Sequence, residues 1–243
     1  MTRDEQWLLE EKHGGKETTE YEADKERLAE GEPLAYVIGW QPFLGLKIYL
    51  DSHPIIPRPE TEWWTEQLLN SITTNSQLTT LDICAGSGAI GCAMLARLPN
   101  AQVYFGEIDP MHEMTMLKNI RENGLDESRA HIRIGDLFRP FADMRFDSIA
   151  ANPPYVPASR ELPKSVADYE PPLALLAGED GLAIIRRIAA ELSRHLVPGG
   201  TAWIECDSGR AEETRMLFET QGLRVKMRTD QYGEFRFIVI SFP

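Results

Sequence analysis

The 243-residue sequence has no long apolar run: no hydrophobic segment approaches the roughly 20 residues that span a bilayer. Its amino terminus lacks the charged-then-apolar layout of a secretion signal, so we expect a cytoplasmic protein with no membrane partner. Cysteine is scarce. Cys84, Cys92 and Cys206 stand far apart without a Cys-x-x-Cys pair, which is typical of buried thiols in a reducing compartment. The five histidines are scattered singly, so we expect no metal site.

Positive charge is also in short supply. There are 25 Lys and Arg against 38 Asp and Glu, a net charge of −13, and the sequence has no run of Lys or Arg. A protein that follows nucleic-acid phosphates needs a basic face to displace counterions, so nucleic acid is disfavoured as a direct partner. The hydrophobic content of 42% is that of an ordinary globular chain, and we expect it to be a monomer.

The first part of the chain differs in composition from the rest. Residues 1–32 hold 11 acidic and 5 basic side chains, with two short helices predicted around a glycine break at residues 14–15. This segment is either a small packed arm or a solvated, partly frayed one. Residues 43–46 predict a hairpin turn. Thr61 is predicted to cap the next helix, which ends near Leu69, and residues 73–77 form a polar linker.

From residue 78 onward, predicted strands and helices alternate. Two further strands, around Val225 and Phe237, close the chain. This order predicts βαβ units and a mostly parallel sheet. The predicted strands are 78–83, 102–105, 131–134, 147–151 and 201–205, and the predicted helices are 89–98, 110–123, 181–195 and 211–221.

A glycine loop follows the first of these strands. Gly86 and Gly88 let the backbone approach a ligand closely, at the edge of the sheet where α/β proteins bind ligands. Residues 86–91 also match Gly-x-Gly-x-x-Gly, a weak signal that a tight strand-to-helix turn explains equally well. Glu107, 19 residues after Gly88, ends the second strand, where a carboxylate can accept both ribose hydroxyls of an adenosine.

Three aspartates lie near this predicted site. Asp82, just before the glycines, is unusual for a nicotinamide site and suits a ligand with a positive centre, such as the sulfonium or amino group of S-adenosylmethionine. Asp109 is better explained as a helix cap. Asp136 can accept the exocyclic amine of an adenine while Leu137 packs on its ring, although a plain turn explains this pair equally well.

The most informative motif is Asn152-Pro153-Pro154-Tyr155, directly after the strand 147–151. The prolines remove two backbone donors, which leaves the Asn152 side-chain oxygen and the Pro153 carbonyl as acceptors for an NH₂ group. Tyr155 offers a flat face to a planar amide or base. An amide nitrogen is a poor nucleophile, so such a site needs acceptors that stabilise developing charge more than a strong base. We therefore predict that Asn152, Pro153 and Tyr155 are catalytic.

Six ordered segments resemble the PrmC/HemK family of protein-(glutamine-N5) methyltransferases, which methylate the glutamine of the Gly-Gly-Gln loop in peptide chain release factors. The resemblance implies S-adenosylmethionine as cofactor. It also implies a class I SAM-dependent methyltransferase fold, Rossmann-like, with a mostly parallel seven-stranded sheet. The segments are residues 31–36, 56–62, the glycine loop, 152–155, 169–171 with 177–182, and 230–236.

The family's sites carry over residue by residue. Its substrate site falls on Asn152, Pro153, Pro154 and Tyr155. By resemblance, Arg58 to Glu62 lies close to the active site. The cofactor site falls on Cys84, Ala85, Gly86, Ser87, Gly88, Glu107, Leu137 and Asn152.

The sequence departs from the family pattern in three places. Cys84 replaces a glycine usual in the release-factor enzymes, and a cysteine there is common in the sister family that methylates a large-subunit ribosomal protein. Glu107 replaces the more usual aspartate. The N-terminal helical domain is shortened, so we expect a shortened helical and hairpin substrate-recognition region at 1–65 and the methyltransferase domain at 66–243. The segment Arg58 to Glu62 favours the release-factor branch.

Four alternatives stay open at this point. The same chemistry can act on a glutamine of a large-subunit ribosomal protein. An adenine N6 methyltransferase of nucleic acid uses the same Asn-Pro-Pro-aromatic pattern, but it needs an extruded base and a basic recognition region. The glycine pattern alone permits an NAD-dependent oxidoreductase, and a cofactor-binding scaffold without catalysis is the fourth.

Overall fold

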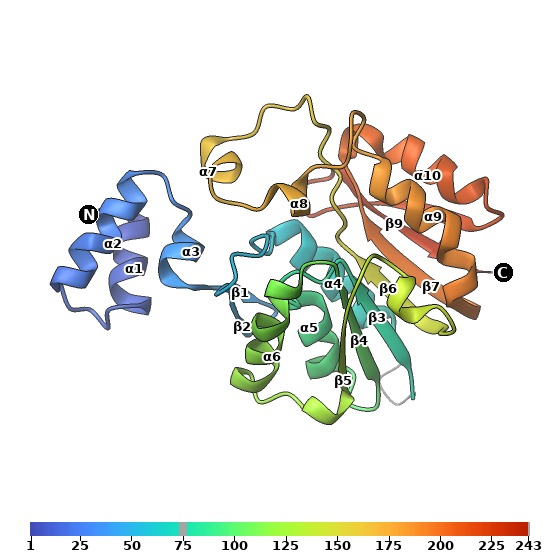
Figure 1. Ribbon diagram of the computed structural model, residues 1–243, viewed down its shortest axis with the longest axis horizontal. Helices are drawn as coiled ribbons and strands as arrows, with labels where there is room; N and C mark the ends of the chain where they lie inside the picture. Colours follow the sequence, from blue (N-terminus) through green and yellow to red (C-terminus); the bar gives the residue numbers. More distant parts are fainter. Residues whose placement is uncertain (73–76, 243) are drawn as a thin grey trace.

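The computed structural model describes residues 1–72 and 77–242, so residues 73–76 of the predicted linker and the last residue of the predicted second domain lie outside the described part. A seven-stranded sheet in the order β5-β4-β3-β6-β7-β9-β8 forms its centre (Figure 1). Strands β3 to β7 run parallel, and β9 is antiparallel to β7 and β8. The predicted mostly parallel, seven-stranded fold is therefore confirmed. The strands are β3 (Thr79–Ile83), β4 (Gln102–Glu107), β5 (Ala130–Ile134), β6 (Phe146–Ala151), β7 (Leu196–Glu205), β8 (Arg224–Thr229) and β9 (Phe235–Ser241).

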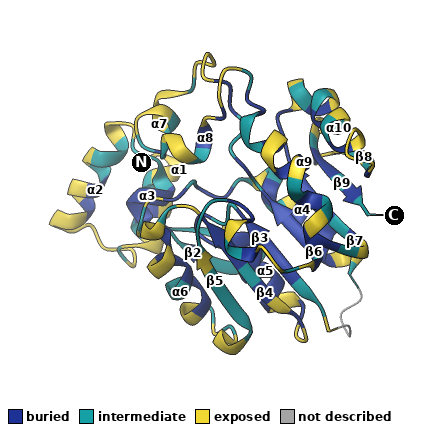
Figure 2. Ribbon diagram, turned by 45° about the vertical axis from the view of Figure 1, so that its right-hand side comes forward, coloured by how far each residue is buried: buried dark blue, intermediate teal, exposed yellow. Residues whose placement is uncertain are grey.

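Helices cover both faces of the sheet, which is why its central strands are buried on both sides, whereas the edge strands β5 and β8 are more exposed (Figure 2). One face packs against α4 (Pro59–Ser71), α5 (Ala89–Arg97) and α6 (Glu113–Glu122), and the other against α9 (Ala183–His195) and α10 (Ala211–Glu219). In α9 the buried residues Ile185, Ile188 and Leu192 recur at helical spacing and form its inner stripe. Short 3₁₀ turns lie at η1 (Pro110–His112), η2 (Glu127–Arg129), η3 (Arg139–Phe141) and η4 (Ser208–Arg210).

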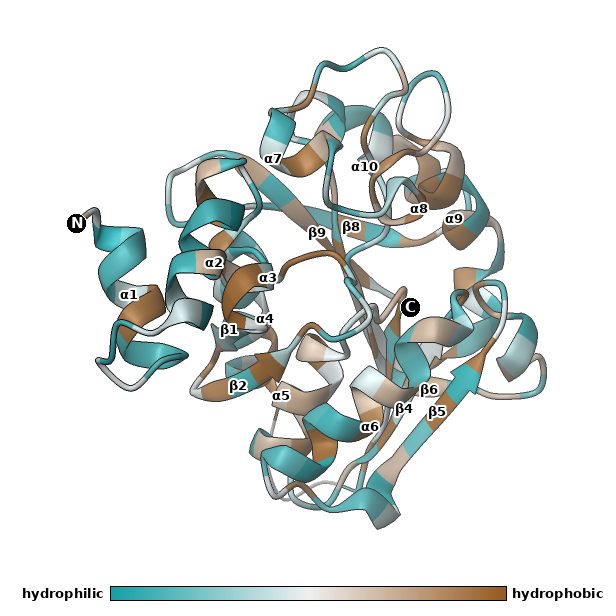
Figure 3. Ribbon diagram, turned by 60° about the vertical axis from the view of Figure 1, so that its left-hand side comes forward, coloured by the Kyte–Doolittle hydropathy of each residue, from teal (hydrophilic) through white to brown (hydrophobic). Residues whose placement is uncertain are grey.

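The acidic N-terminal segment is a packed arm. Helices α1 (Arg3–Glu11), α2 (Thr19–Ala29) and α3 (Leu34–Ile38) stand beside the sheet in Figure 1. In Figure 3, α1 and α2 consist mostly of hydrophilic residues, whereas α3 is mostly hydrophobic. Their buried residues Leu8, Tyr21, Val37 and Ile38 form a separate small cluster. The buried carboxylate of Asp24 forms ion pairs with side chains on either side of it. The frayed alternative is therefore wrong for this arm.

A hairpin connects the arm to the sheet domain. Strands β1 (Trp40–Phe43) and β2 (Leu46–Tyr49) meet at Leu44 and Gly45, whose φ values of 48° and 81° are those of a type I′ turn. The helix that follows corrects the predicted cap: α4 begins at Pro59 with Arg58 as its N-cap, because proline is favoured in the first turn. Thr61 lies inside the helix, where its hydroxyl donates to the carboxylate of Glu205 at 2.6 Å.

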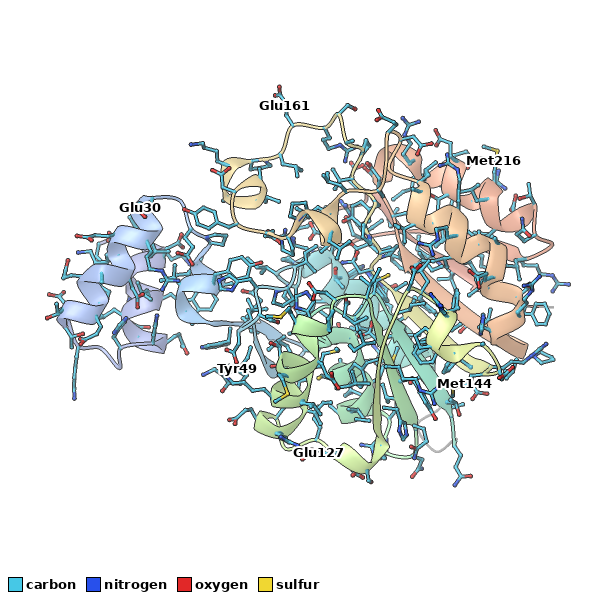
Figure 4. All side chains as sticks on the ribbon, in the orientation of Figure 1. Glu30, Tyr49, Glu127, Met144, Glu161 and Met216 are labelled. Carbon is cyan, nitrogen blue, oxygen red and sulfur yellow. The ribbon has the colours of Figure 1, made fainter. Side chains whose placement is uncertain are left out.

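A long segment after β6 lies beyond the carboxyl ends of the parallel strands (Figure 1). This strap, residues 156–181, contains α7 (Lys164–Ala167) and α8 (Pro172–Leu175). Its two ends pair at a bridge between Val156 and Leu176. The Tyr169 hydroxyl in the strap donates to the carbonyl oxygen of Glu30 in the arm at 3.3 Å. Figure 4 labels Glu30 on the arm and, further along the strap, Glu161, which points outward.

Candidate active site

A pocket of about 760 Å³, partly open to solvent, lies at the carboxyl ends of β3, β4, β5 and β6. The strand order reverses between β3 and β6, which is where open α/β sheets bind ligands. The pocket brings together seven of the predicted site residues. These seven are Cys84, Gly86, Glu107, Asp136, Leu137, Asn152 and Pro154.

Glu107 is the buried carboxylate of this pocket. Its Oε2 accepts from the Gly86 N–H at 2.7 Å, and its Oε1 accepts from the N–H groups of Ile108 and Asp109 at 2.9 Å. These bonds from the glycine loop and the end of β4 fix the direction of the side chain. A carboxylate offers about four acceptor sites, so most of the remaining capacity is on Oε2.

Two pocket residues adopt left-handed backbone conformations. Cys84 has a φ of 62° and Leu137 a φ of 46°, values that side chains rarely adopt. Cys84 is only partly buried, unlike Cys92 and Cys206, so the prediction of three buried thiols is wrong for it. Asp136 lines the pocket and pairs with Arg187 of α9 at 2.6 Å, so one of its oxygens is already bound.

Three residues of the glycine loop do not line the pocket. The Ala85 N–H donates to the Gly106 carbonyl at 3.1 Å, and Ser87 is buried with its carbonyl accepting from Asn119 at 2.8 Å. Gly88 starts α5 with a φ of 78°, and a Cβ there would lie 3.0 Å from a Met116 side-chain carbon. These residues shape the loop and hold it against β4 and α6.

Asp82 also lies outside the pocket lining. Its side chain is fully buried, and Oδ2 accepts from the Gly91 N–H at the start of α5 at 2.8 Å. Burial raises the pKa of this carboxyl well above its usual range, and the nearby charge of Glu107 raises it further. The structure thus gives Asp82 a part in joining β3 to α5 and no contact with the pocket. Asp109 caps η1 as predicted, with Oδ1 accepting from the Met111 N–H at 2.9 Å.

The Asn152-Pro153-Pro154-Tyr155 motif follows β6 directly. Asn152 lines the pocket, and its side-chain nitrogen donates to the Thr61 hydroxyl at 3.2 Å. Among the described residues, no donor reaches its side-chain oxygen. Pro153 is buried and does not line the pocket. Tyr155 does not line the pocket; its hydroxyl donates to Glu205 at 2.9 Å, and burial raises its pKa.

Glu205, at the carboxyl end of β7, is a site residue that sequence reasoning missed. It is 1% exposed and accepts from Thr61 at 2.6 Å, Trp64 at 2.7 Å and Tyr155 at 2.9 Å. Burial raises its pKa, while these three bonds and the charge of Arg236 lower it. Its position at the end of a parallel strand was the available signal, since all such ends meet at one edge of the sheet.

The strap is tied to the segment before α4. The buried carboxylate of Glu170 accepts from the Arg58 guanidinium at 2.5 Å and from the Ile56 N–H at 3.1 Å. Arg58 therefore holds the strap, whereas Thr61 reaches the motif. Other lining residues that the sequence did not indicate are Ile55, Leu173, Ala174, Ile184 and Arg187.

The comparisons identify the family. A family profile described as "Methyltransferase small domain" matches residues 60–168. The release factor glutamine methyltransferase of Chlamydia trachomatis serovar L2 is 33% identical over 212 residues, which cover 86% of this chain and 72% of that protein. The one from Geobacter sulfurreducens is 37% identical over 198 residues, 81% of this chain and 68% of that protein. The chain belongs to the release factor glutamine methyltransferase family. The resemblance drawn from the sequence motifs is confirmed.

A solved structure of another methyltransferase provides independent evidence for the fold. The T. thermophilus 16S rRNA N2 G1207 methyltransferase, in complex with AdoMet and guanosine, is similar with a TM-score of 0.58 at 17% identity, covering 84% of this chain and 50% of that chain. The methyltransferase fold is thereby confirmed. Within residues 1–72 and 77–242, no helix has the length and apolarity to cross a membrane, and no group of His, Cys, Asp or Glu side chains is arranged to hold a metal ion.

Proposed function

We propose that this chain transfers a methyl group from S-adenosylmethionine to the side-chain amide nitrogen of the glutamine in the Gly-Gly-Gln loop of peptide chain release factors. The observation that carries the proposal is the free side-chain oxygen of Asn152 at the edge of the pocket. It stands directly after β6 in a chain whose relatives are release factor glutamine methyltransferases.

The pocket suits the cofactor. Its buried carboxylate Glu107 has acceptor capacity left on Oε2 for a ribose hydroxyl, and Leu137 and Ile184 offer apolar surface to a base. The fold is shared with a methyltransferase solved with AdoMet. When bound, S-adenosylmethionine supplies an electrophilic methyl group. We further propose Asp136, beside Arg187, as an acceptor for the adenine amine.

Asn152 and Pro153 act on the substrate amide in this proposal. The Asn152 side-chain oxygen and the Pro153 carbonyl accept the two N–H hydrogens of the glutamine amide. Positive charge develops on that nitrogen as its lone pair forms the bond to the methyl carbon, while the electrons of the broken carbon–sulfur bond would stay with the sulfur of the cofactor. Two fixed acceptors stabilise this charge without solvent reorganisation, and one of the two N–H protons is then released to solvent. Pro154, which lines the pocket, faces the glutamine side chain, and Tyr155 packs behind the motif. Tyr155 contributes its ring, because its hydroxyl is bound to Glu205.

We propose residues 1–65 as the region that recognises the protein substrate and residues 66–243 as the catalytic domain. The packed arm is joined to the strap by Tyr169 and Glu30, so a substrate bound at the arm lies near the segment that covers the site. A monomeric state, a cytoplasmic location and the lack of a nucleic-acid partner stay predictions.

The test is a methylation assay with mass-spectrometric mapping. The purified chain is incubated with S-adenosylmethionine and a full-length release factor, and separately with a large-subunit ribosomal protein and with duplex DNA and RNA. We expect one methyl group on the glutamine of the Gly-Gly-Gln loop. A methyl group only on the ribosomal protein or on adenine would replace this proposal with one of the alternatives, and binding of NADH in place of S-adenosylmethionine would refute it.

A further inference from the structure

A buried hydrogen-bond chain links three segments that are far apart in the sequence. The Asn152 side-chain nitrogen donates to the Thr61 hydroxyl at 3.2 Å, and that hydroxyl donates to Glu205 Oε2 at 2.6 Å. Thr61 and Glu205 are 4% and 1% exposed. Neither lines the pocket, so any effect on the reaction has to pass through the motif residues that they hold, Asn152 and Tyr155.

The donor-to-acceptor direction of this hydrogen-bond chain is fixed at its Glu205 end. The Trp64 indole N–H, which can only donate, also points at Glu205 Oε2, at 2.7 Å. Oε2 is therefore an acceptor, and the single proton of the Thr61 hydroxyl goes to it. The hydroxyl is left with only lone pairs for Asn152, so the amide nitrogen has to face Thr61 and the amide oxygen faces away.

We propose that Thr61 and Glu205 are positioning residues, which hold the Asn152 side-chain amide so that its oxygen, and not its nitrogen, faces the bound substrate amide. A flipped amide would set its oxygen against the lone pairs of Thr61 and its NH₂ against the NH₂ of the substrate. Both contacts are repulsive, so the hydrogen-bond chain favours the orientation in which the Asn152 oxygen faces the substrate amide. Glu205 also holds the Tyr155 hydroxyl at 2.9 Å, so one carboxylate orients two residues of the motif. This inference rests on the proposed function.

The experiment compares Thr61→Val, which has the same shape without the hydroxyl, with Thr61→Ser, which keeps it. Loss of one buried hydrogen bond changes an equilibrium by about tenfold, so we expect kcat on the release factor to fall about tenfold or more in Thr61→Val. KM and the Kd of S-adenosylmethionine should change less than about twofold, because the lost interaction acts on orientation and not on ground-state binding. Thr61→Ser should recover most of kcat.

Thr65→Val is the matched control. Thr65 lies one turn further along α4, is 0% exposed, and its hydroxyl has no hydrogen-bond partner among the described residues. We expect this variant to keep wild-type kcat and to show any general effect of a buried Thr-to-Val change on the melting temperature. Glu205→Gln is the second variant. Its amide oxygen can face Trp64 and Thr61 while its nitrogen donates to Tyr155, so it should lose less kcat than Thr61→Val.

A readout without turnover separates the two proposals. The side-chain ¹H–¹⁵N signals of Asn152, assigned through Asn152→Ala, should show a hydrogen-bonded, slowly exchanging NH₂ group in the wild type and in Thr61→Ser, and a fast-exchanging one in Thr61→Val. If the wild type shows slowly exchanging Asn152 NH₂ signals but methylates no release factor, the proposed function is refuted and the positioning role is retained. Wild-type kcat or an unchanged Asn152 signal in Thr61→Val would overturn the positioning role, as would equal losses in Thr61→Val and Thr65→Val.

Discussion

Gly181 lies directly against the backbone of Tyr155: a Cβ at residue 181 would stand 2.4 Å from the Tyr155 carbonyl oxygen. Gly181 also has a φ of 77°, which side chains rarely adopt. Gly181→Ala should therefore push the Asn152-to-Tyr155 motif out of place. We expect a loss of unfolding free energy of about 2–4 kcal/mol, from strain and overpacking together, and a loss of kcat of at least about tenfold. Chemical denaturation and the methylation assay measure the two effects.

Gly222→Ala is the control for this prediction. Gly222 has nearly the same φ, 78°, but a Cβ there would meet no atom within 4 Å. Gly222→Ala should therefore lose only about 1 kcal/mol of unfolding free energy, from the backbone conformation alone, and keep full activity. Equal effects of the two substitutions would show that the close contact with Tyr155 has no importance for the site.

Asn152→Ala should remove methyl transfer while largely sparing the cofactor. The substitution deletes one of the two acceptors for the substrate amide, and removal of one preorganised hydrogen-bonding group at a reacting centre typically lowers kcat by about 10²–10³-fold. Isothermal titration calorimetry should give a Kd for S-adenosylmethionine within about threefold of the wild type, since Glu107 and the glycine loop stay intact. Turnover of Asn152→Ala at the wild-type rate would contradict the acceptor mechanism.

Most of the fold follows from local patterns in the sequence. Strands such as 79–83 and 146–151 are short apolar runs next to glycine or proline, and α9 has an apolar stripe at helical spacing. The pocket was predictable for the same reason: parallel strands place their carboxyl ends at one edge, which brings Glu107 and Asn152 together although they are 45 residues apart.

Side-chain partners across the fold were not predictable. Thr61 has the residue type and position of a helix cap, and only packing of α4 on the sheet reveals that its hydroxyl reaches Glu205. Asp82 precedes the glycine loop as a ligand-binding carboxylate would, yet its side chain turns to the α5 backbone. Whether a side chain at the end of a strand faces the pocket depends on the pleat and register of that strand, and the sequence motif determines neither of them.

Asp82 should make stability depend on pH. Its pKa is raised in the folded protein, chiefly by burial. Its contribution to stability is therefore fully present below its unfolded pKa, about 4, and is lost as pH rises through the folded pKa. Asp82→Asn removes this titration, and its amide oxygen can still accept from Gly91. The unfolding free energy of the variant relative to the wild type should increase as the pH rises above about 4. Asp126→Asn should give the opposite slope, because hydrogen bonds to Ser128 lower the Asp126 pKa.

Glu107 should tolerate a shorter acid better than its isosteric amide. Three backbone N–H groups point at its two oxygens, so in Glu107→Gln the amide NH₂ has to face at least one donor. The NH₂ group takes the Oε2 side, where it faces one donor and not two, so the acceptor left for a ribose hydroxyl is lost. A missing hydrogen bond of this kind costs about 1–3 kcal/mol, which predicts a rise of about 10–100-fold in the Kd of S-adenosylmethionine. Glu107→Asp keeps acceptors on both oxygens and should bind more tightly than Glu107→Gln. Calorimetric titration of both variants decides the point: if the Gln variant binds as well as the wild type, the carboxylate is not what holds the cofactor and the loop geometry alone suffices.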